Sequence, residues 1–199
     1  DQVVPPITGS AVGKSVWDVD GMDKTGGRLK FCDDYTAGDI GSDTLLHGAF
    51  VWAPVPHAKI NAVDYAAAEQ AEGVVRIVTA ADVPGMNKMG TWTPEQPVFC
   101  TDEVNFLGDH LALVVADTVE HARAAAKLVR IDYEELPGIY TMADGYRKNS
   151  FIVHTGRKSG DVEQAKQRPD IVKINVSKEI EPQEHACMEP VSAIGMVQD

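Results

Sequence analysis

The chain has 199 residues, of which 44% are hydrophobic and 24% charged, enough to bury one good core, or one compact domain with part of a second. Its formal net charge of −12 repels the phosphates of nucleic acids and anionic lipids, so we expect neither nucleic acid nor a membrane as a partner. No apolar run approaches the roughly 18 residues that span a bilayer, and residues 1–6 lack a secretory pattern, which together predict a cytoplasmic protein.

The N-terminal part of the chain is polar and has no sustained period. Residues 7–25 are rich in Gly, Asp and Ser and are predicted to be extended, and we assign residues 1–17 to a separate lead-in. Two strand-like runs follow at 29–35 and 45–52, separated by a loop of turn-forming residues. We expect these runs to be able to pair as antiparallel neighbours.

A strand–helix–strand unit is predicted between residues 60 and 78. Residues 60–63 form a short strand, after which Asp64 can cap a brief Ala-rich helix through Gln70 by accepting hydrogen bonds from free N–H groups. Gly73 ends that helix. The β-branched run 74–78 is apolar enough for an interior strand.

A second unit of the same plan is predicted between residues 111 and 137. The continuous apolar run 111–116 predicts a buried strand, and Asp117, with Glu120 three residues on, fits a variant of the capping box. The helix that follows ends near Leu128, and its predicted apolar face consists of Ala122, Ala125, Ala126 and Val129. A strand at 129–133 completes the unit, and the fold class is α+β.

The remaining residues divide into two parts. Residues 140–168 are polar and irregular, whereas 171–177 alternate like a half-exposed strand. Residues 170–199 have too few strand partners within the chain to complete a sheet, so we expect them to expose an unpaired edge and an apolar face. A domain boundary is predicted between residues 140 and 155.

The three cysteines, Cys32, Cys100 and Cys187, are far apart in sequence and form no Cys-x-x-Cys pair. This spacing indicates neither an iron–sulfur site nor a structural zinc site. We expect reduced, buried thiols.

Three possible metal ligands lie near the C-terminus: His185, Cys187 and Glu189. On a helix, His185 and Glu189 would share one face. The preceding segment alternates like a strand, however, in which four residues span about 13 Å, and Pro190 favours an extended Glu189. Structural hydrogen bonding is therefore the preferred interpretation, and a metal hydrolase that uses His185, Glu189 and His57 is an alternative.

Three further features have an ordinary explanation. His57 follows two prolines in a rigid turn, and no carboxylate, Ser or Cys stands nearby in sequence to orient it, so local hydrogen bonding is expected. The segment 85–90 lacks the spacing of a phosphate-binding loop and is expected to be a mobile surface loop. Residues 175–177 match a glycosylation triplet by chance. No residue set completes a catalytic, cofactor-binding or metal-binding constellation, so no site residue is predicted.

Seven phrases in order nevertheless resemble a known family. They are VDGMDKTG at 19–26, LHG at 46–48, PHAKI at 56–60, EGVVRIVTAADVPG at 72–85, QPVFC at 96–100, GDHLALVVAD at 108–117 and VRIDYEELP at 129–137. The family is that of the molybdenum hydroxylases, which includes xanthine dehydrogenase, aldehyde oxidase and bacterial aldehyde oxidoreductase. The phrases at 97–100 and 185–190 are closer to the bacterial aldehyde oxidoreductases than to the xanthine dehydrogenases.

This resemblance implies an α/β hammerhead domain over residues 18–140, followed at 141–199 by a linker and the opening strands of a molybdopterin-binding domain. Family enzymes hydroxylate an aldehyde or an N-heterocycle such as xanthine, with oxygen from water, at a molybdenum bound by a pterin. Their electrons pass through iron–sulfur clusters. The family's catalytic motifs are absent from this sequence, so the resemblance implies a segment that is structural and inactive in isolation.

The expected partners are therefore the remaining molybdopterin-binding domains and an iron–sulfur domain or subunit, with an aldehyde or heterocycle as the substrate of the whole enzyme. This segment alone is expected to bind no cofactor. The alternative is a free-standing hammerhead module that acts as a binding or assembly protein.

Overall fold

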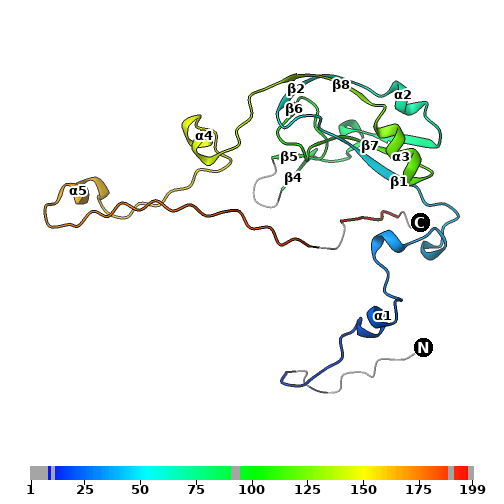
Figure 1. The fold of residues 1–199 in the computed structure, drawn as a ribbon, viewed down its shortest axis with the longest axis horizontal. Helices are drawn as coiled ribbons and strands as arrows, with labels where there is room; N and C mark the ends of the chain where they lie inside the picture. The colour runs from blue at the N-terminus through cyan, green and yellow to red at the C-terminus, as the bar shows by residue number, and fades with distance from the viewer. Residues whose placement is uncertain (1–8, 10–11, 91–94, 188–190, 197–199) are drawn as a thin grey trace. The chain divides into compact units, whose positions relative to one another are not determined.

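The computed structural model describes residues 9, 12–90, 95–187 and 191–196 (Figure 1). The chain divides into two compact units, of which one comprises residues 1–45 and 182–199 and the other residues 46–181. The second unit carries most of the regular secondary structure.

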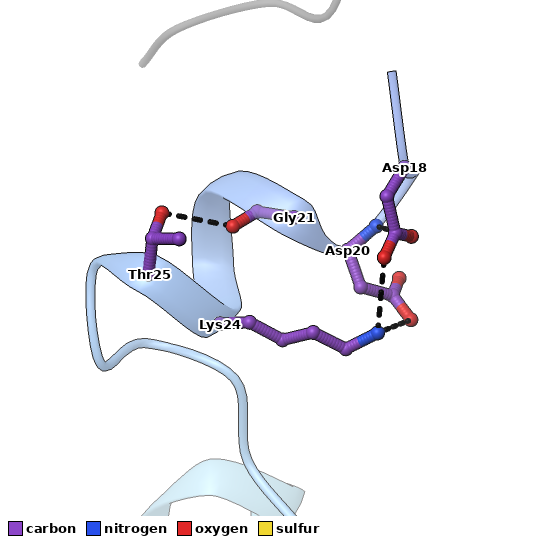
Figure 2. Close-up of polar contacts among 5 residues, drawn as sticks. All are labelled: Asp18, Asp20, Gly21, Lys24 and Thr25. Atoms are coloured by element: carbon purple, nitrogen blue, oxygen red, sulfur yellow. Dashed lines mark hydrogen bonds and ion pairs between the residues drawn. The ribbon is translucent and has the colours of Figure 1, made fainter. Parts of the chain in front are cut away.

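The first unit begins with a short helix, α1 (Gly21–Thr25), in a region that the sequence predicted to be extended. The carboxylate of Asp18 accepts from the backbone N–H of Asp20 at 3.1 Å and from Lys24 Nζ at 3.3 Å (Figure 2). The hydroxyl of Thr25 donates to the carbonyl oxygen of Gly21 at 2.8 Å. These local contacts tie the ends of the single turn to each other, which explains why a Gly- and Asp-rich segment can turn here.

The strand predicted at 29–35 is wrong, since this segment contains a 3₁₀ turn, η1 (Cys32–Asp34). The Asp34 carboxylate accepts a hydrogen bond from the Phe31 amide at 3.0 Å, and the Asp34 amide donates to the Phe31 carbonyl at 2.9 Å. Side-chain acceptors that satisfy nearby amides compete with strand pairing. A second 3₁₀ turn, η2 (Gly38–Ile40), follows, so the predicted pairing of 29–35 with the next strand does not form.

The second unit contains all the strands that the described residues form (Figure 1). One three-stranded sheet has the order β1–β7–β3, a second has the order β6–β2–β8, and β4 pairs with β5. The strands are β1 (His47–Trp52), β2 (Ala58–Asp64), β3 (Val74–Val78), β4 (Lys88–Met89), β5 (Gln96–Pro97), β6 (Glu103–Val104), β7 (His110–Ala116) and β8 (Arg130–Glu135). The helices are α2 (Ala66–Glu69), α3 (Val119–Ala126), α4 (Met142–Arg147) and α5 (Val162–Gln167), with a 3₁₀ turn η3 (Ala80–Asp82).

The two strand–helix–strand units are present in the order that the sequence predicted, but their strands are exchanged between the sheets. In the first unit, β2 and β3 flank α2; in the second, β7 and β8 flank α3. β2 pairs antiparallel with β8, and β3 pairs antiparallel with β7. Each unit is thus incomplete without the other. The prediction that 74–78 is an interior strand is wrong, because β3 lies at the edge of its sheet.

The core is built around β7, the central strand of the first sheet. Val51 of β1 pairs with Ala112 and Trp52 pairs with His110, so Leu111 has no partner in β1. This β-bulge turns both Leu111 and Ala112 inward. Leu111 is 1% exposed, and Ala112 and Val114 are 0% exposed. The continuous apolar run predicted a buried strand correctly, and the bulge explains why apolar residues are needed at consecutive positions.

Helix α3 packs on β1 and β7 through the buried Ala122 and Ala125. Its cap differs from the prediction by one residue, since the Thr118 hydroxyl, and not Asp117, accepts the His121 amide hydrogen bond at 3.1 Å. Asp64 accepts from the Ala66 amide at 3.0 Å, which confirms its expected contact with the start of α2, although Tyr65 occupies the cap position itself.

Asp117 has another partner, the imidazole of His121, whose Nδ1 lies 2.6 Å from Asp117 Oδ1. The hydrogen bond from His121 lowers the pKa of Asp117, and the hydrogen bond to Asp117 raises the pKa of His121. Gly73 covers this pair with φ of +74°, and a Cβ there would overlap Asp117 Oδ1 and His121 Nδ1. The turn between α2 and β3 therefore needs glycine for its conformation and for space.

The substitution Gly73→Ala is expected to lower the free energy of unfolding by about 1–2 kcal/mol, because an L-residue is forced into the left-handed region. Urea denaturation followed by circular dichroism measures this change. Gly85→Ala is the control, since nothing lies within 4 Å of the position that its Cβ would occupy and its φ is not in the left-handed region. Equal stability of wild type and Gly73→Ala would contradict the argument.

The outer face of the first sheet is apolar. Phe50 of β1 stacks on His110 of β7 with ring centroids 4.2 Å apart, and Trp52 lies 4.6 Å from the same imidazole. Phe50 is 41% and Trp52 54% exposed. Helix α3 packs on the opposite side of these strands through its alanines, so the sheet presents an exposed aromatic cluster on one face and a buried aliphatic core on the other.

The segment after β8 was predicted to be irregular up to residue 168, but it contains α4 and α5. The strand predicted at 171–177 is absent, since these residues have no regular secondary structure and all except Ile171 are exposed. A strand needs a partner for its N–H and C=O groups, and none pairs with this segment within the described residues. Val172, Ile174 and Val176 are exposed, as the sequence predicted for an apolar face without a partner.

The segment 85–90 lies at the surface, and part of it is ordered by pairing: Lys88 and Met89 form β4 opposite Gln96 and Pro97. The side chain of Asn87 also bonds the backbone of Phe99, donating to its carbonyl at 2.8 Å and accepting from its amide at 3.0 Å. Among the described residues, no helix is long and apolar enough to cross a membrane.

Candidate functional site

Among the described candidate residues named from the sequence, His57 makes the most hydrogen bonds. Its Nε2 lies 2.9 Å from Glu103 Oε1, and its Nδ1 lies 3.0 Å from the carbonyl oxygen of Pro137. Its own carbonyl accepts from the Leu136 amide at 2.9 Å. The expectation of local hydrogen bonds is wrong, because all three partners are distant in sequence.

The fold explains this meeting. His57 immediately precedes β2, Glu103 begins β6, and Leu136 and Pro137 immediately follow β8, so the three strands of one sheet bring these residues to the same end. The hydrogen bond to Glu103, followed by that to Pro137, raises the pKa of the imidazole, while partial burial and the charge of Lys148 act in the opposite direction. The pair is partly accessible, with 26% of the His57 side chain and 51% of the Glu103 side chain exposed.

This pair forms part of the wall of a groove of about 1080 Å³. The rest of the wall is mainly apolar and aromatic, and comes from the loop after β6 and from the segment that contains α4: Asn105, Phe106, Leu107, residues 138–142, Gly145, Tyr146 and residues 150–153. Such a lining suits an apolar side chain or ring. Both ring nitrogens of His57 are engaged by protein acceptors, so the imidazole has no free position for acid–base catalysis in this conformation.

Cys100 is buried beside a buried carboxylate, Asp109. Burial, followed by the negative charge of Asp109 and a hydrogen bond to it, raises the pKa of the Cys100 thiol to about 12. The thiol is therefore protonated and unreactive at neutral pH. Cys32 and Cys187 are free and exposed, which corrects the prediction that all three thiols are buried.

Thiol labelling of the native protein at pH 8 with a water-soluble disulfide reagent should modify Cys32 and Cys187 rapidly and leave Cys100 unmodified. Addition of denaturant should release the third thiol, because unfolding removes both the burial and the neighbouring carboxylate. Mass spectrometry of the labelled peptides distinguishes the sites. Rapid native labelling of Cys100 would contradict the structure.

The comparison with protein families identifies the fold. Residues 26–137 match the model of the aldehyde oxidase and xanthine dehydrogenase a/b hammerhead domain. The chain belongs to this family. The match covers more than half of the chain and ends at Pro137, whose carbonyl oxygen is the hydrogen-bond partner of His57 Nδ1.

Two relatives of this hammerhead chain are named as dehydrogenase subunits. A probable xanthine dehydrogenase subunit of Bacillus subtilis is 34% identical over 188 residues, which cover 90% of this chain and 24% of the relative. The nicotinate dehydrogenase large molybdopterin subunit of Eubacterium barkeri is 31% identical over 81% of this chain and 39% of the relative. The chain thus spans between about a quarter and two fifths of the length of these two relatives.

Solved structures agree. The aldehyde oxidoreductase of Desulfovibrio desulfuricans is similar with a TM-score of 0.64 at 28% identity, over 79% of this chain and 19% of that chain. That of Desulfovibrio gigas is similar with a TM-score of 0.52 at 34% identity, over 60% of this chain and 14% of that chain. The hammerhead fold and the molybdenum hydroxylase family predicted from the sequence are therefore confirmed. The preference for aldehyde oxidoreductases over xanthine dehydrogenases stays a prediction, since both groups match.

Potential metal ligands do not converge in the hammerhead. Within the part of the chain that the structure describes, no group of three or more His, Cys, Asp or Glu side chains could hold a metal ion. His185 and Cys187 lie exposed in an irregular segment, and Glu189 lies outside the described residues. The side chains of the described residues thus provide no donor set that fits a metal centre.

Proposed function

We propose that this chain forms the hammerhead part of a molybdenum-dependent hydroxylase and has a structural role within it. The observation that carries the proposal is the hammerhead match over residues 26–137, together with the small share of each relative that the chain spans. The complete enzyme would oxidise an aldehyde, or an N-heterocycle such as xanthine, with oxygen from water. It would act in the cytoplasm.

The proposed domain boundaries are those of the sequence analysis, with the hammerhead at 18–140 and a linker and the beginning of a molybdopterin-binding domain at 141–199. The last strand of the second sheet, β8, ends at Glu135. Beyond α5, the exposed alternating residues Val172, Ile174 and Val176 have the pattern of a strand whose partners lie elsewhere. This supports a change of domain after the hammerhead.

The proposed partners are the remaining molybdopterin-binding domains and an iron–sulfur domain or subunit. Two exposed apolar surfaces support such partners: the aromatic cluster of Phe50 and Trp52 and the alternating segment after α5. Exposed apolar surface of this kind usually marks a protein contact. The molybdopterin-type cofactor and the iron–sulfur clusters would be bound by those other parts.

The test is isolation of the protein from its native source with an antibody against this segment, followed by intact mass spectrometry and elemental analysis for molybdenum and iron. Recovery in a much larger protein or complex that contains both metals is the expected result. A native species of 21.5 kDa, free of both metals and of partners, would overturn the proposal and favour a free-standing hammerhead module that serves binding or assembly.

A further inference from the structure

The hydrogen bonds of His57 require two protons on the ring. A neutral imidazole has one N–H donor, whereas an imidazolium has two. Both ring nitrogens of His57 face oxygen atoms that accept, the carboxylate of Glu103 at 2.9 Å and the carbonyl of Pro137 at 3.0 Å. At a pH at which Glu103 is ionised, only the charged ring satisfies both acceptors.

The neutral ring must give up one of these contacts. The hydrogen bond to the carboxylate is charge-assisted and hence the stronger of the two, so a single remaining proton stays on Nε2, facing Glu103. The lone pair of Nδ1 then faces the lone pairs of the Pro137 carbonyl oxygen, which is repulsive. Loss of the proton therefore weakens the contact between His57 and Pro137 first.

Pro137 is the residue through which the chain leaves β8 and enters the far wall of the groove. The groove is lined on one side by His57, Glu103 and the loop 105–107, and on the other by residues 138–142 and 150–153. The charged groups that act on the ring are Glu103 from β6 and Lys148, which follows α4. The charge on His57 thus sits where the two walls of the groove join.

We propose that His57 is a proton-dependent latch: its charged ring fastens Pro137 to Glu103 and so fixes the point at which the segment 138–153 leaves β8, and loss of the proton loosens that segment beside the groove. Because the folded-state pKa of His57 is raised, the stabilisation is fully present below the ordinary value of 6.5 and is lost as the pH rises through the folded-state pKa. The segment is therefore fixed in acid and loosened toward alkaline pH.

The experiment uses the 199-residue chain. Imidazole C–H signals are followed by NMR through a pH titration, with the signal of His57 assigned from its loss in His57→Gln. In parallel, hydrogen exchange of the peptide 136–153 is measured by mass spectrometry and corrected for the intrinsic pH dependence of exchange. We expect His57 to titrate above 6.5, and the corrected opening constant of 136–153 to rise by up to about tenfold per pH unit over that range, as linkage to one proton requires.

Two variants sharpen the test. Glu103→Gln keeps an acceptor but removes the charge, so it should bring the His57 titration back toward its ordinary value and shift the opening of 136–153 to lower pH. His121→Gln removes the histidine–carboxylate pair at the start of α3, His121 with Asp117, and should leave both readouts unchanged.

The proposal is overturned if His57 titrates at or below 6.5, if Glu103→Gln leaves its titration in place, or if the corrected exchange of 136–153 in the wild type does not depend on pH while His57 titrates. If His57→Gln fails to fold, the His57 signal is assigned as the one whose titration moves in Glu103→Gln. If no imidazole signal moves in that variant, the proposal is overturned.

Discussion

Replacement of Leu111 by alanine should lower the free energy of unfolding by about 2–5 kcal/mol, a cost that combines lost transfer energy with the cavity left behind. Leu111 is 1% exposed and is among the largest fully buried side chains of the described chain. It occupies the bulge of β7, the strand on which both β1 and β3 depend for pairing, so the surrounding backbone has little freedom to collapse into the cavity.

Urea denaturation monitored by far-UV circular dichroism measures the effect, and Leu128→Ala is the matched control. Leu128 lies just beyond α3 and is 44% exposed, so the same truncation there should cost well under half as much. A midpoint for Leu111→Ala that equals the midpoint of the control would show that the bulge is not part of the core.

The local elements of the second unit could be predicted because their information is local. The run 111–116 is apolar without interruption, which favours a buried strand, and the alanines of α3 recur at helical spacing on the face that packs on it. The assignment of strands to sheets could not be predicted in this way. β2 pairs with β8, and β3 pairs with β7. Nothing in the sequence of a single strand predicts which distant strand will pair with its backbone N–H and C=O groups.

The two helices after β8 were missed although signals for them exist. Thr141 caps α4 by accepting from the Asp144 amide at 3.1 Å, and Asp161 caps α5 by accepting from the Gln164 amide at 2.9 Å. A threonine followed three residues later by an aspartate is a capping pattern, and it precedes α4 here. The helices are six residues each, too short for hydrophobic periodicity to reveal them.

Two strands that the sequence predicted are absent. At 29–35, the carboxylate of Asp34 satisfies the Phe31 amide locally, so the backbone turns. At 171–177, the pattern is that of a strand but no described strand pairs with it, and an isolated strand gains nothing from its propensity. The sequence pattern indicates which structure a segment prefers, whereas the available strand partners decide whether that structure forms.

The candidate site shows the same limit. Sequence analysis found His57 but gave it only local partners, because Glu103 lies 46 residues away and belongs to a strand of two residues that carries no pattern of its own. The groove beside His57 is lined in part by α4, a helix that the sequence analysis also missed. In contrast, the family could be identified from seven short phrases, since their order along the chain carries information that no single phrase has.

Replacement of Asp109 by alanine should lower the free energy of unfolding by about 3 kcal/mol. Asp109 is 2% exposed, and its Oδ2 accepts from the backbone amides of Asn105 at 2.7 Å and Phe106 at 3.3 Å. The neighbouring thiol of Cys100 also bonds this carboxylate. Alanine would leave these donors unpaired next to the core, and each buried donor left without a partner costs roughly 1–3 kcal/mol.

Asp109→Asn separates the hydrogen bonds from the charge. Its side-chain oxygen can still accept from the two loop amides, so the loss of stability should be smaller than for alanine, while removal of the negative charge should lower the pKa of Cys100 from its value of about 12. Asp102→Ala is the control, because that carboxylate is exposed. Within the described part of the chain, its only side-chain hydrogen bond is the one that it accepts from the adjacent Thr101 hydroxyl. Chemical denaturation gives the order of stability, and thiol titration in the folded state gives the pKa. If Asp109→Asn were as unstable as Asp109→Ala, the buried charge itself, and not the loop hydrogen bonds, would be what holds the turn between β6 and β7.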